Sequence, residues 1–238
     1  MKKQYVIVML AIGCLSLFNV HADIKIKNET ELFNRIDGRD SSNKEWEIKT
    51  QQFLETKDYA FVLGGHITRG YNDNVETKDN WDLNAKVEAR VIEDLAVVGF
   101  LKREVDKNAN DLVTWDLEVF GKYFFIHSSQ NKFFTEIGLK LTKKSFESGE
   151  SENYSKLKIK FEIEKEITDK VFFKAVNDNF IGLNANEDWE MALEPSLNFK
   201  LSKNNTLRFG YFHKYKKDNN PLVNNNNYGF ILGLILKH

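Results

Sequence analysis

Apolar and charged side chains alternate strictly in the stretch WDLNAKVEARV, which covers residues 81–91. One parity, from Trp81 to Val91, is apolar, and the opposite parity is polar or ionised. Because successive side chains of a strand point to opposite faces, this stretch is predicted to be a strand with one apolar and one charged face. A soluble β-sandwich would turn the apolar face inward, whereas an outer-membrane barrel would turn it outward to lipid.

Read with a period of two, the chain after residue 22 breaks into segments of about ten residues, the length that crosses a bilayer at a tilt of about 45°. The alternation is weakest in 24–34 and 171–178. The twelve predicted strands are 24–34, 44–54, 59–71, 81–91, 95–104, 112–125, 133–143, 154–164, 171–178, 189–201, 206–215 and 227–237.

The connections between these segments alternate between tight and long. Residues 55–58, 92–94 and 202–205 are tight, whereas 72–80, 144–153, 177–188 and 216–227 are long and polar. Outer-membrane barrels have short periplasmic turns, longer outer loops and an even number of strands. The pattern therefore favours an all-β, closed, antiparallel transmembrane barrel of twelve strands over a soluble sandwich.

Residues 1–22 are predicted to be a secretory signal peptide. Two lysines precede an apolar run from Tyr5 to Phe18, and Val20-His21-Ala22 is typical of a cleavage site. Lipidation of Cys14 is the alternative, and either reading exports the protein. With few prolines and no linker, residues 23–238 are expected to form one barrel domain in the bacterial outer membrane.

Charge excludes one class of partner. Removal of Lys2 and Lys3 with the signal changes the formal net charge from −1 to −3, so no affinity for nucleic acid is expected. No stretch after residue 22 approaches the ~18 apolar residues of a membrane helix. The expected partners are the lipid bilayer and small hydrophilic solutes.

The final segment, NYGFILGLILKH, alternates large apolar residues with Gly229, Ile231, Gly233 and Ile235. It resembles the C-terminal assembly signal of outer-membrane barrels, matched by Asn227, Gly229, Leu232 and Leu234. Such proteins usually finish on Phe or Trp, whereas this chain adds Lys237 and His238. The resemblance implies recognition by the outer-membrane assembly machinery.

Strand parity predicts which side chains face the interior. Acids and bases occur there in nearly equal numbers, so selectivity would require rings of one sign, and the alternative is that cross-strand ion pairs hold the barrel in register. The predicted pore-lining residues are Lys49, Lys86, Glu88, Arg90, Asp116, Glu118, Lys122, Glu136, Lys140, Lys156, Lys158, Lys160, Glu190, Glu194 and Arg208.

In architecture the chain resembles the small, twelve-stranded, oligogalacturonate-specific porins, through its mature length, short turns and charged interior. That resemblance implies a channel whose arginine-rich lumen passes acidic oligosaccharides. This chain has six arginines, of which the segments place Arg90 and Arg208 inward. The expected function is therefore a channel for small hydrophilic or charged solutes, a class that includes oligosaccharides. The alternative is a closed structural or adhesive barrel without transport.

A barrel hydrolase is a third reading. His127, Ser129 and Glu136 resemble the His-x-Ser plus Glu set of the barrel that deacylates lipid A. The predicted strands place His127 and Ser129 in a periplasmic turn, whereas that chemistry needs the outer leaflet, so no enzyme activity is expected. His66, His213 and His238 have no metal-ligand spacing, and no phosphate loop or dinucleotide motif occurs, so neither a metal nor a cofactor is predicted. Pro195, within a strand, predicts a bulge.

Overall fold

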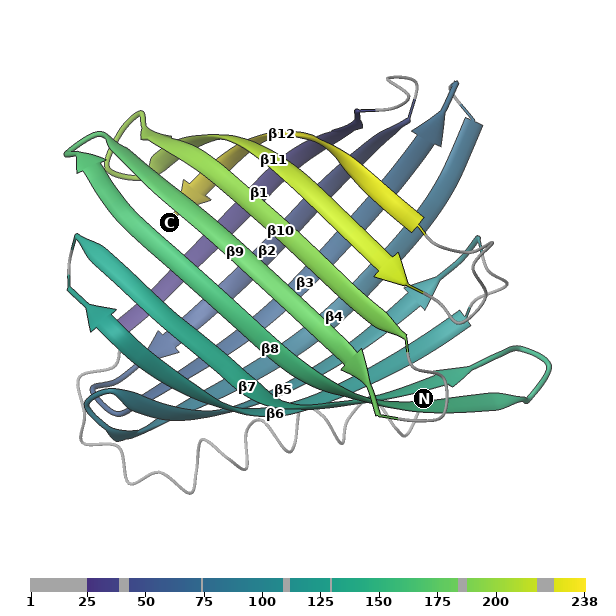
Figure 1. Cartoon of the computed structure of the whole chain (residues 1–238). Coiled ribbons are helices and arrows are strands. Elements are labelled where there is room, and N and C mark those ends of the chain that lie inside the picture. Colours follow the sequence, from purple (N-terminus) through teal and green to yellow (C-terminus); the bar gives the residue numbers. More distant parts are fainter. Residues whose placement is uncertain are drawn as a thin grey trace.

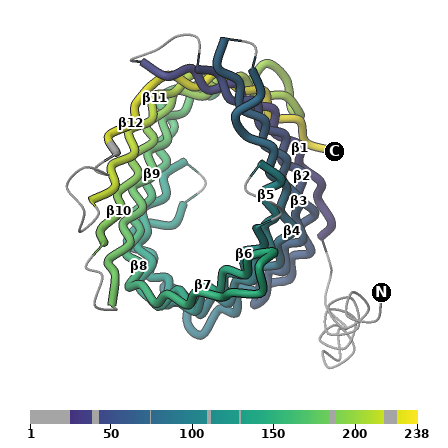
Figure 2. The backbone as a smooth tube through the Cα atoms, turned by 90° about the vertical axis from the view of Figure 1, so that its right-hand side faces the viewer, coloured from purple at the N-terminus to yellow at the C-terminus, as the bar shows by residue number. Residues whose placement is uncertain are grey.

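Twelve antiparallel strands close into a barrel in the computed structural model, which describes residues 25–38, 43–73, 75–108, 112–128, 130–183, 188–217 and 225–238 (Figure 1). Each strand pairs with its neighbours in sequence, and β1 pairs with β12. Seen along its axis the chain forms a ring (Figure 2). The strands are β1 (Lys25–Asp37), β2 (Lys44–Glu55), β3 (Tyr59–Asn72), β4 (Val75–Ile92), β5 (Leu95–Asp106), β6 (Leu112–His127), β7 (Asn131–Ser145), β8 (Ser151–Thr168), β9 (Val171–Gly182), β10 (Trp189–Lys200), β11 (Asn205–Lys217) and β12 (Asn225–Lys237).

The predicted strands and tight turns are confirmed, and the long connections are shorter than predicted. β4 begins at Val75, inside the predicted loop 72–80, and β9 continues to Gly182, inside the predicted loop 177–188. The physical reason is that a strand that extends beyond the bilayer has water on its outer face. Ladder hydrogen bonds then continue without the apolar parity by which the segments were delimited. None of the described residues forms a helix that could cross a membrane.

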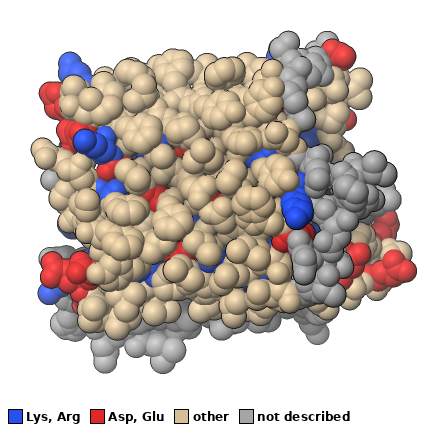
Figure 3. Space-filling view, viewed as in Figure 1, with Lys and Arg blue, Asp and Glu red and all other residues tan. Residues whose placement is uncertain are grey.

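The outer face of the barrel is apolar. Leu117, Val119, Ile137, Leu139 and Leu141 are each 46–54% exposed although they are large and hydrophobic. Most of the surface in the view of Figure 3 is uncharged, and the charged side chains that reach it gather mainly toward the two ends of the barrel. An apolar exterior of this kind is typical of a surface in contact with lipid. The apolar side chains of residues 81–91 therefore point outward, and the sandwich interpretation is wrong.

The first and last strands complete the ring. Leu32 is opposite Leu234, and the backbones of Asn28 and His238 exchange two hydrogen bonds of 3.1 and 2.9 Å. Lys237 and His238, the departure from the usual C-terminus, therefore extend the closing strand pair. Closure leaves no unpaired edge, as a bilayer requires.

The prediction of a bulge at Pro195 is wrong. The register between β9 and β10 runs through the pair Pro195–Ala175 without a shift, and the register with β11 is the same on both sides of Pro195. Proline removes one N–H donor but its fixed φ is compatible with a strand, so the ladder loses pairs there without gaining a residue.

The start of β1, the end of β12 and the tight turns lie at one end of the barrel, here called the turn end. Lys25 of β1 is opposite Glu55, which precedes the turn before Tyr59. The strand ends at Asp37, Asp106, Ser145, Gly182 and Lys217 lie at the opposite end, here called the loop end. The predicted signal peptide, residues 1–22, lies outside the described residues.

Candidate functional site: the charged barrel interior

The structure places all fifteen predicted pore-lining residues on the inner parity, opposite to the lipid-facing residues. Asp116, Glu118 and Glu136 are only 2–5% exposed, although charged groups are rarely buried unless they are paired. The set comes from β2 (Lys49), β4 (Lys86, Glu88, Arg90), β6 (Asp116, Glu118, Lys122), β7 (Glu136, Lys140), β8 (Lys156, Lys158, Lys160), β10 (Glu190, Glu194) and β11 (Arg208).

Many interior ion pairs join strands that are separated by one strand. Adjacent strands are about 4.8 Å apart, so this separation is about twice that distance, and a lysine stem spans it. Pairs of this kind are Lys122–Glu88 (3.1 Å), Lys158–Glu118 (2.7 Å) and Lys156–Glu190 (2.9 Å). The described ion pairs link strands no more than three places apart around the ring. They therefore follow the barrel wall.

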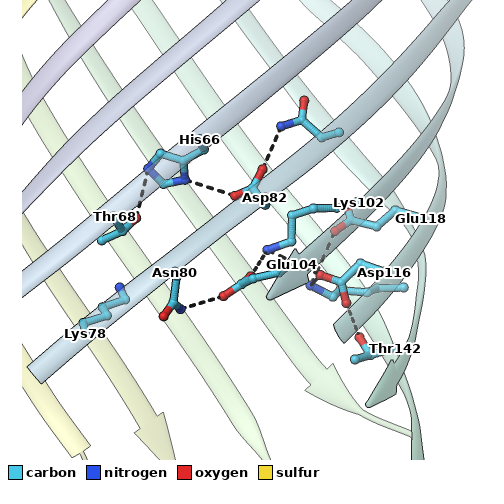
Figure 4. Close-up of polar contacts among 12 residues, drawn as sticks. His66, Thr68, Lys78, Asn80, Asp82, Lys102, Glu104, Asp116, Glu118 and Thr142 are labelled. Atoms are coloured by element: carbon cyan, nitrogen blue, oxygen red, sulfur yellow. Dashed lines mark hydrogen bonds and ion pairs between the residues drawn. The ribbon is translucent and has the colours of Figure 1, made fainter. Parts of the chain in front are cut away.

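Asp116 collects several donors on one carboxylate (Figure 4). It accepts hydrogen bonds from Lys140 (2.9 Å) and the Thr142 hydroxyl (2.6 Å), and Lys102 Nζ lies at 3.7 Å. Lys102 in turn bonds to Glu104 at 2.5 Å. These contacts tie β5, β6 and β7 together on their inner face.

His66 joins a second cluster, for which the sequence predicted no role. Its Nδ1 lies 3.1 Å from Asp82, and its Nε2 lies 3.2 Å from the Thr68 hydroxyl (Figure 4). The Nε2 atom also lies 3.3 Å from Glu47. The inward parity of His66 was readable from the sequence. Its two acidic partners were not, because they depend on the registers of β3 with β2 and β4.

Arg35 is an interior arginine that the sequence missed. Its guanidinium contacts Glu47 at 2.9 Å and reaches Glu194 of β10 at 3.3 Å. The predicted first strand ended at residue 34, whereas β1 continues to Asp37. Arg35 therefore joins Arg90 and Arg208 on the inner face.

Interior cations also lie over phenylalanine rings, in an arrangement that occurs twice. Phe120 of β6 is opposite Gly138 of β7, which is opposite Lys158 of β8, and Lys158 Nζ lies 4.4 Å from the Phe120 ring centroid. In the second row, Phe33, Gly233 and Arg208 follow one another on β1, β12 and β11, with the guanidinium 5.3 Å from the Phe33 ring. Such contacts stabilise a partly desolvated cation.

Glycine is required at the centre of these rows. A Cβ atom at Gly138 would lie 2.1 Å from the Val119 carbonyl oxygen and 2.4 Å from the Phe120 Cβ atom, and one at Gly233 would lie 2.3 Å from the Phe33 ring. The ring can cross to the next strand only because no side chain intervenes. Inward-facing phenylalanines alternating with charges were visible in the sequence but were not singled out.

Two chambers open toward the loop end of the interior. The larger, of about 470 Å³, is lined by five acidic and five basic side chains, among them Lys102, Lys140, Asp116 and Glu190. The smaller, of about 340 Å³, includes Arg35, Lys78, Lys214 and Glu45. Within the described residues, Arg90 and Lys214 have no ion-pair partner.

The described residues do not bring together His127, Ser129 and Glu136, the set that a barrel hydrolase would need. The His127 ring stacks on Phe124 at 4.8 Å, and Glu136 faces Lys158 at 3.7 Å and Lys160 at 4.0 Å. Ser129 lies outside the described residues. Over the described residues, no group of three or more His, Cys, Asp or Glu side chains is placed to hold a metal.

Comparison with known proteins agrees with this architecture. A family model described as "Protein of unknown function, DUF481" matches residues 20–237. No curated protein sequence matches. Among solved structures, the NanC porin has a TM-score of 0.65 at 9% identity, and the KdgM porin has a TM-score of 0.54 at 6% identity. In both cases 87% of this chain and 98% of the other are covered. A KdgM porin in complex with disordered oligogalacturonate has a TM-score of 0.53 at 7% identity, with the same coverage. At these identities the likeness shows the fold alone, which this chain shares with these porins.

Proposed function

The chain belongs to the DUF481 family, and from this premise we propose, on the geometry of the interior, that it is an outer-membrane channel for the diffusion of small hydrophilic solutes. The observation that carries the proposal is the path of the interior ion pairs. Among the described residues they follow the wall between strands at most three places apart and do not bridge opposite sides of the ring. A ring of twelve strands lies between the filled eight-strand barrels and the open sixteen-strand porins, so a narrow polar passage fits its size.

The charge balance supports a passage of weak selectivity. Acidic and basic residues are equal in number around the larger chamber, and most interior cations neutralise a neighbouring acid. Solutes recognised by one sign of charge would require unpaired groups arranged in a ring. We therefore assign the channel to neutral or mixed small solutes, including oligosaccharides, and not to polyanions alone.

Single-channel recording in planar bilayers tests the proposal. Purified, folded protein should give steady ohmic steps, and a salt gradient should give a reversal potential close to zero. A bilayer that stays silent after insertion of heat-modifiable protein would instead support a closed structural or adhesive barrel. A large reversal potential would contradict the charge balance.

The route to the membrane belongs to the same proposal. Residues 1–22 act as a signal peptide, and β12 carries the signal for the assembly machinery in Asn227, Gly229, Leu232 and Leu234. The outward placement of Leu232 and Leu234, in register with Phe209 and Leu207 of β11, supports this role. The turn end then lies in the periplasm and the loop end outside the cell.

A further inference from the structure

A row of aromatic and basic side chains crosses the outer face of the barrel near the loop end. Arg103 of β5 is opposite Trp115 of β6, and Trp115 is opposite Lys143 of β7. The Arg103 guanidinium carbon lies 5.1 Å from the Trp81 ring centroid and 5.7 Å from that of Trp115. Arg103 is therefore held between two indoles at the level where amphipathic rings favour the membrane interface.

Neither Arg103 nor Lys143 has an acidic partner among the described residues. Arg69, another outward cation at the same end, differs, because it lies 3.6 Å from Glu76 and 3.5 Å from Asp79. An arginine presents five N–H donors in a fixed fork that matches phosphate. A cation at the edge of the hydrocarbon layer is stabilised by an anion at the same depth, and the Trp81–Arg103–Trp115 stack offers its guanidinium edge to one.

A groove on the outer face begins beside this row. It has a volume of about 380 Å³, and its lining includes Leu101, Leu117 and Leu141 together with Trp115, Lys143 and Asn153. Leu117 is 46% exposed and Leu141 is 50% exposed. On each strand the leucine lies nearer the membrane centre than the polar or basic residue. The groove is therefore apolar toward the membrane centre and basic toward the loop end.

We propose that this groove binds a lipid of the outer leaflet that carries a phosphorylated headgroup. The phosphate lies between the Arg103 guanidinium and the Lys143 ammonium group, and an acyl chain lies along Leu101, Leu117 and Leu141. Charge complementarity selects the phosphorylated lipid over an uncharged one. The site rests on the outer-membrane location of the fold and is independent of transport through the interior.

Native mass spectrometry of detergent-purified protein with added bisphosphorylated lipid A tests the site. Wild-type protein should retain the lipid, and R103Q/K143Q should weaken retention by about tenfold or more, because charge-assisted hydrogen bonds to the phosphate are lost. R103K/K143R keeps both charges but loses the stacked guanidinium at position 103, so its retention should lie between that of wild type and that of R103Q/K143Q. Retention by R103Q/K143Q equal to that of wild type would overturn the proposal.

Two controls separate a specific site from general stickiness. K165Q removes an exposed outward cation at the turn end and should leave retention unchanged. Phosphate-free lipid A should bind the wild-type protein at least about tenfold more weakly, a comparison that needs no variant to fold. Equal retention of the two lipids, or an equal loss in K165Q, would show only an apolar or nonspecific surface.

Discussion

At the residue scale, buried carboxylates in the interior each interact with several hydrogen-bond donors or cations. Asp116 is 3% exposed. It accepts hydrogen bonds from Lys140 and Thr142 and forms an ion pair with Lys102. A buried charge of this kind persists because its partners compensate its loss of hydration. The direct consequence is that removing the carboxylate takes the nearest negative charge from Lys140, weakens the compensation of Lys102 and leaves the Thr142 hydroxyl without this acceptor.

The substitution D116N should therefore destabilise the barrel by about 2 kcal/mol or more, since it keeps the shape but removes the charge that Lys140 and Lys102 face. Urea unfolding in lipid vesicles measures the change. The matched control is E55Q, which breaks the exposed pair Lys27–Glu55 at the turn end and should cost well under about 1 kcal/mol. Equal losses in the two variants would contradict the account.

The sequence predicted the inner face of these residues but not their partners. Parity alone places Lys158 inside, yet its nearest acid is Glu118, two strands away, and not Glu136 of the adjacent strand. Arg35 was missed because the predicted first strand ended at Asn34, one residue before it, whereas β1 continues to Asp37. Partner choice follows from register and side-chain reach, which one sequence does not encode in any local pattern.

At the element scale, three adjacent strands are held together by the contact of a phenylalanine ring with a lysine across an intervening glycine. The row Phe120–Gly138–Lys158 crosses β6, β7 and β8, and Phe120 itself is 4% exposed. The row fixes the register of β7, because a shift by one residue would bring Leu139 beneath the Phe120 ring.

The substitution G138A should destabilise the barrel by about 1–3 kcal/mol through overpacking against the Val119 carbonyl and Phe120. G121A is a matched control on the neighbouring strand, because a Cβ atom there meets nothing within 4 Å. Its effect should be within about 0.5 kcal/mol. Thermal unfolding followed by heat-modifiable gel migration distinguishes the two, and comparable losses would argue against the close packing over Gly138.

The element boundaries show where the periodic pattern stops being informative. All twelve strands were predicted, including the weak segment 171–178, but β4 and β9 were cut short at the loop end. Pro195 was read as a bulge because proline lacks a donor, whereas the strand tolerates the missing hydrogen bonds without changing register. Strand existence follows from alternation over the bilayer, and strand ends follow from ladder pairing beyond it.

At the scale of the whole molecule, closure and sidedness follow from the same alternation. An even number of strands brings the start of β1 and the end of β12 to the turn end, and β12 closes on β1. The paired acids and bases of the interior make weak selectivity the expected electrical property. The conductance experiment therefore tests the function, whereas the orientation of the two faces underlies both the function and the lipid site.

Cysteine scanning of β4 tests that orientation most directly, because the sole cysteine of the chain is Cys14, within the predicted signal peptide. Single cysteines at Asn84, Lys86 and Glu88 should react with a membrane-impermeant, water-soluble thiol reagent in reconstituted vesicles. Cysteines at Leu83, Ala85 and Val87 should resist it and instead be reached by a lipid-dissolved probe. Labelling that is reversed, or that does not alternate along the strand, would contradict a barrel with an apolar exterior and a water-filled, charged interior.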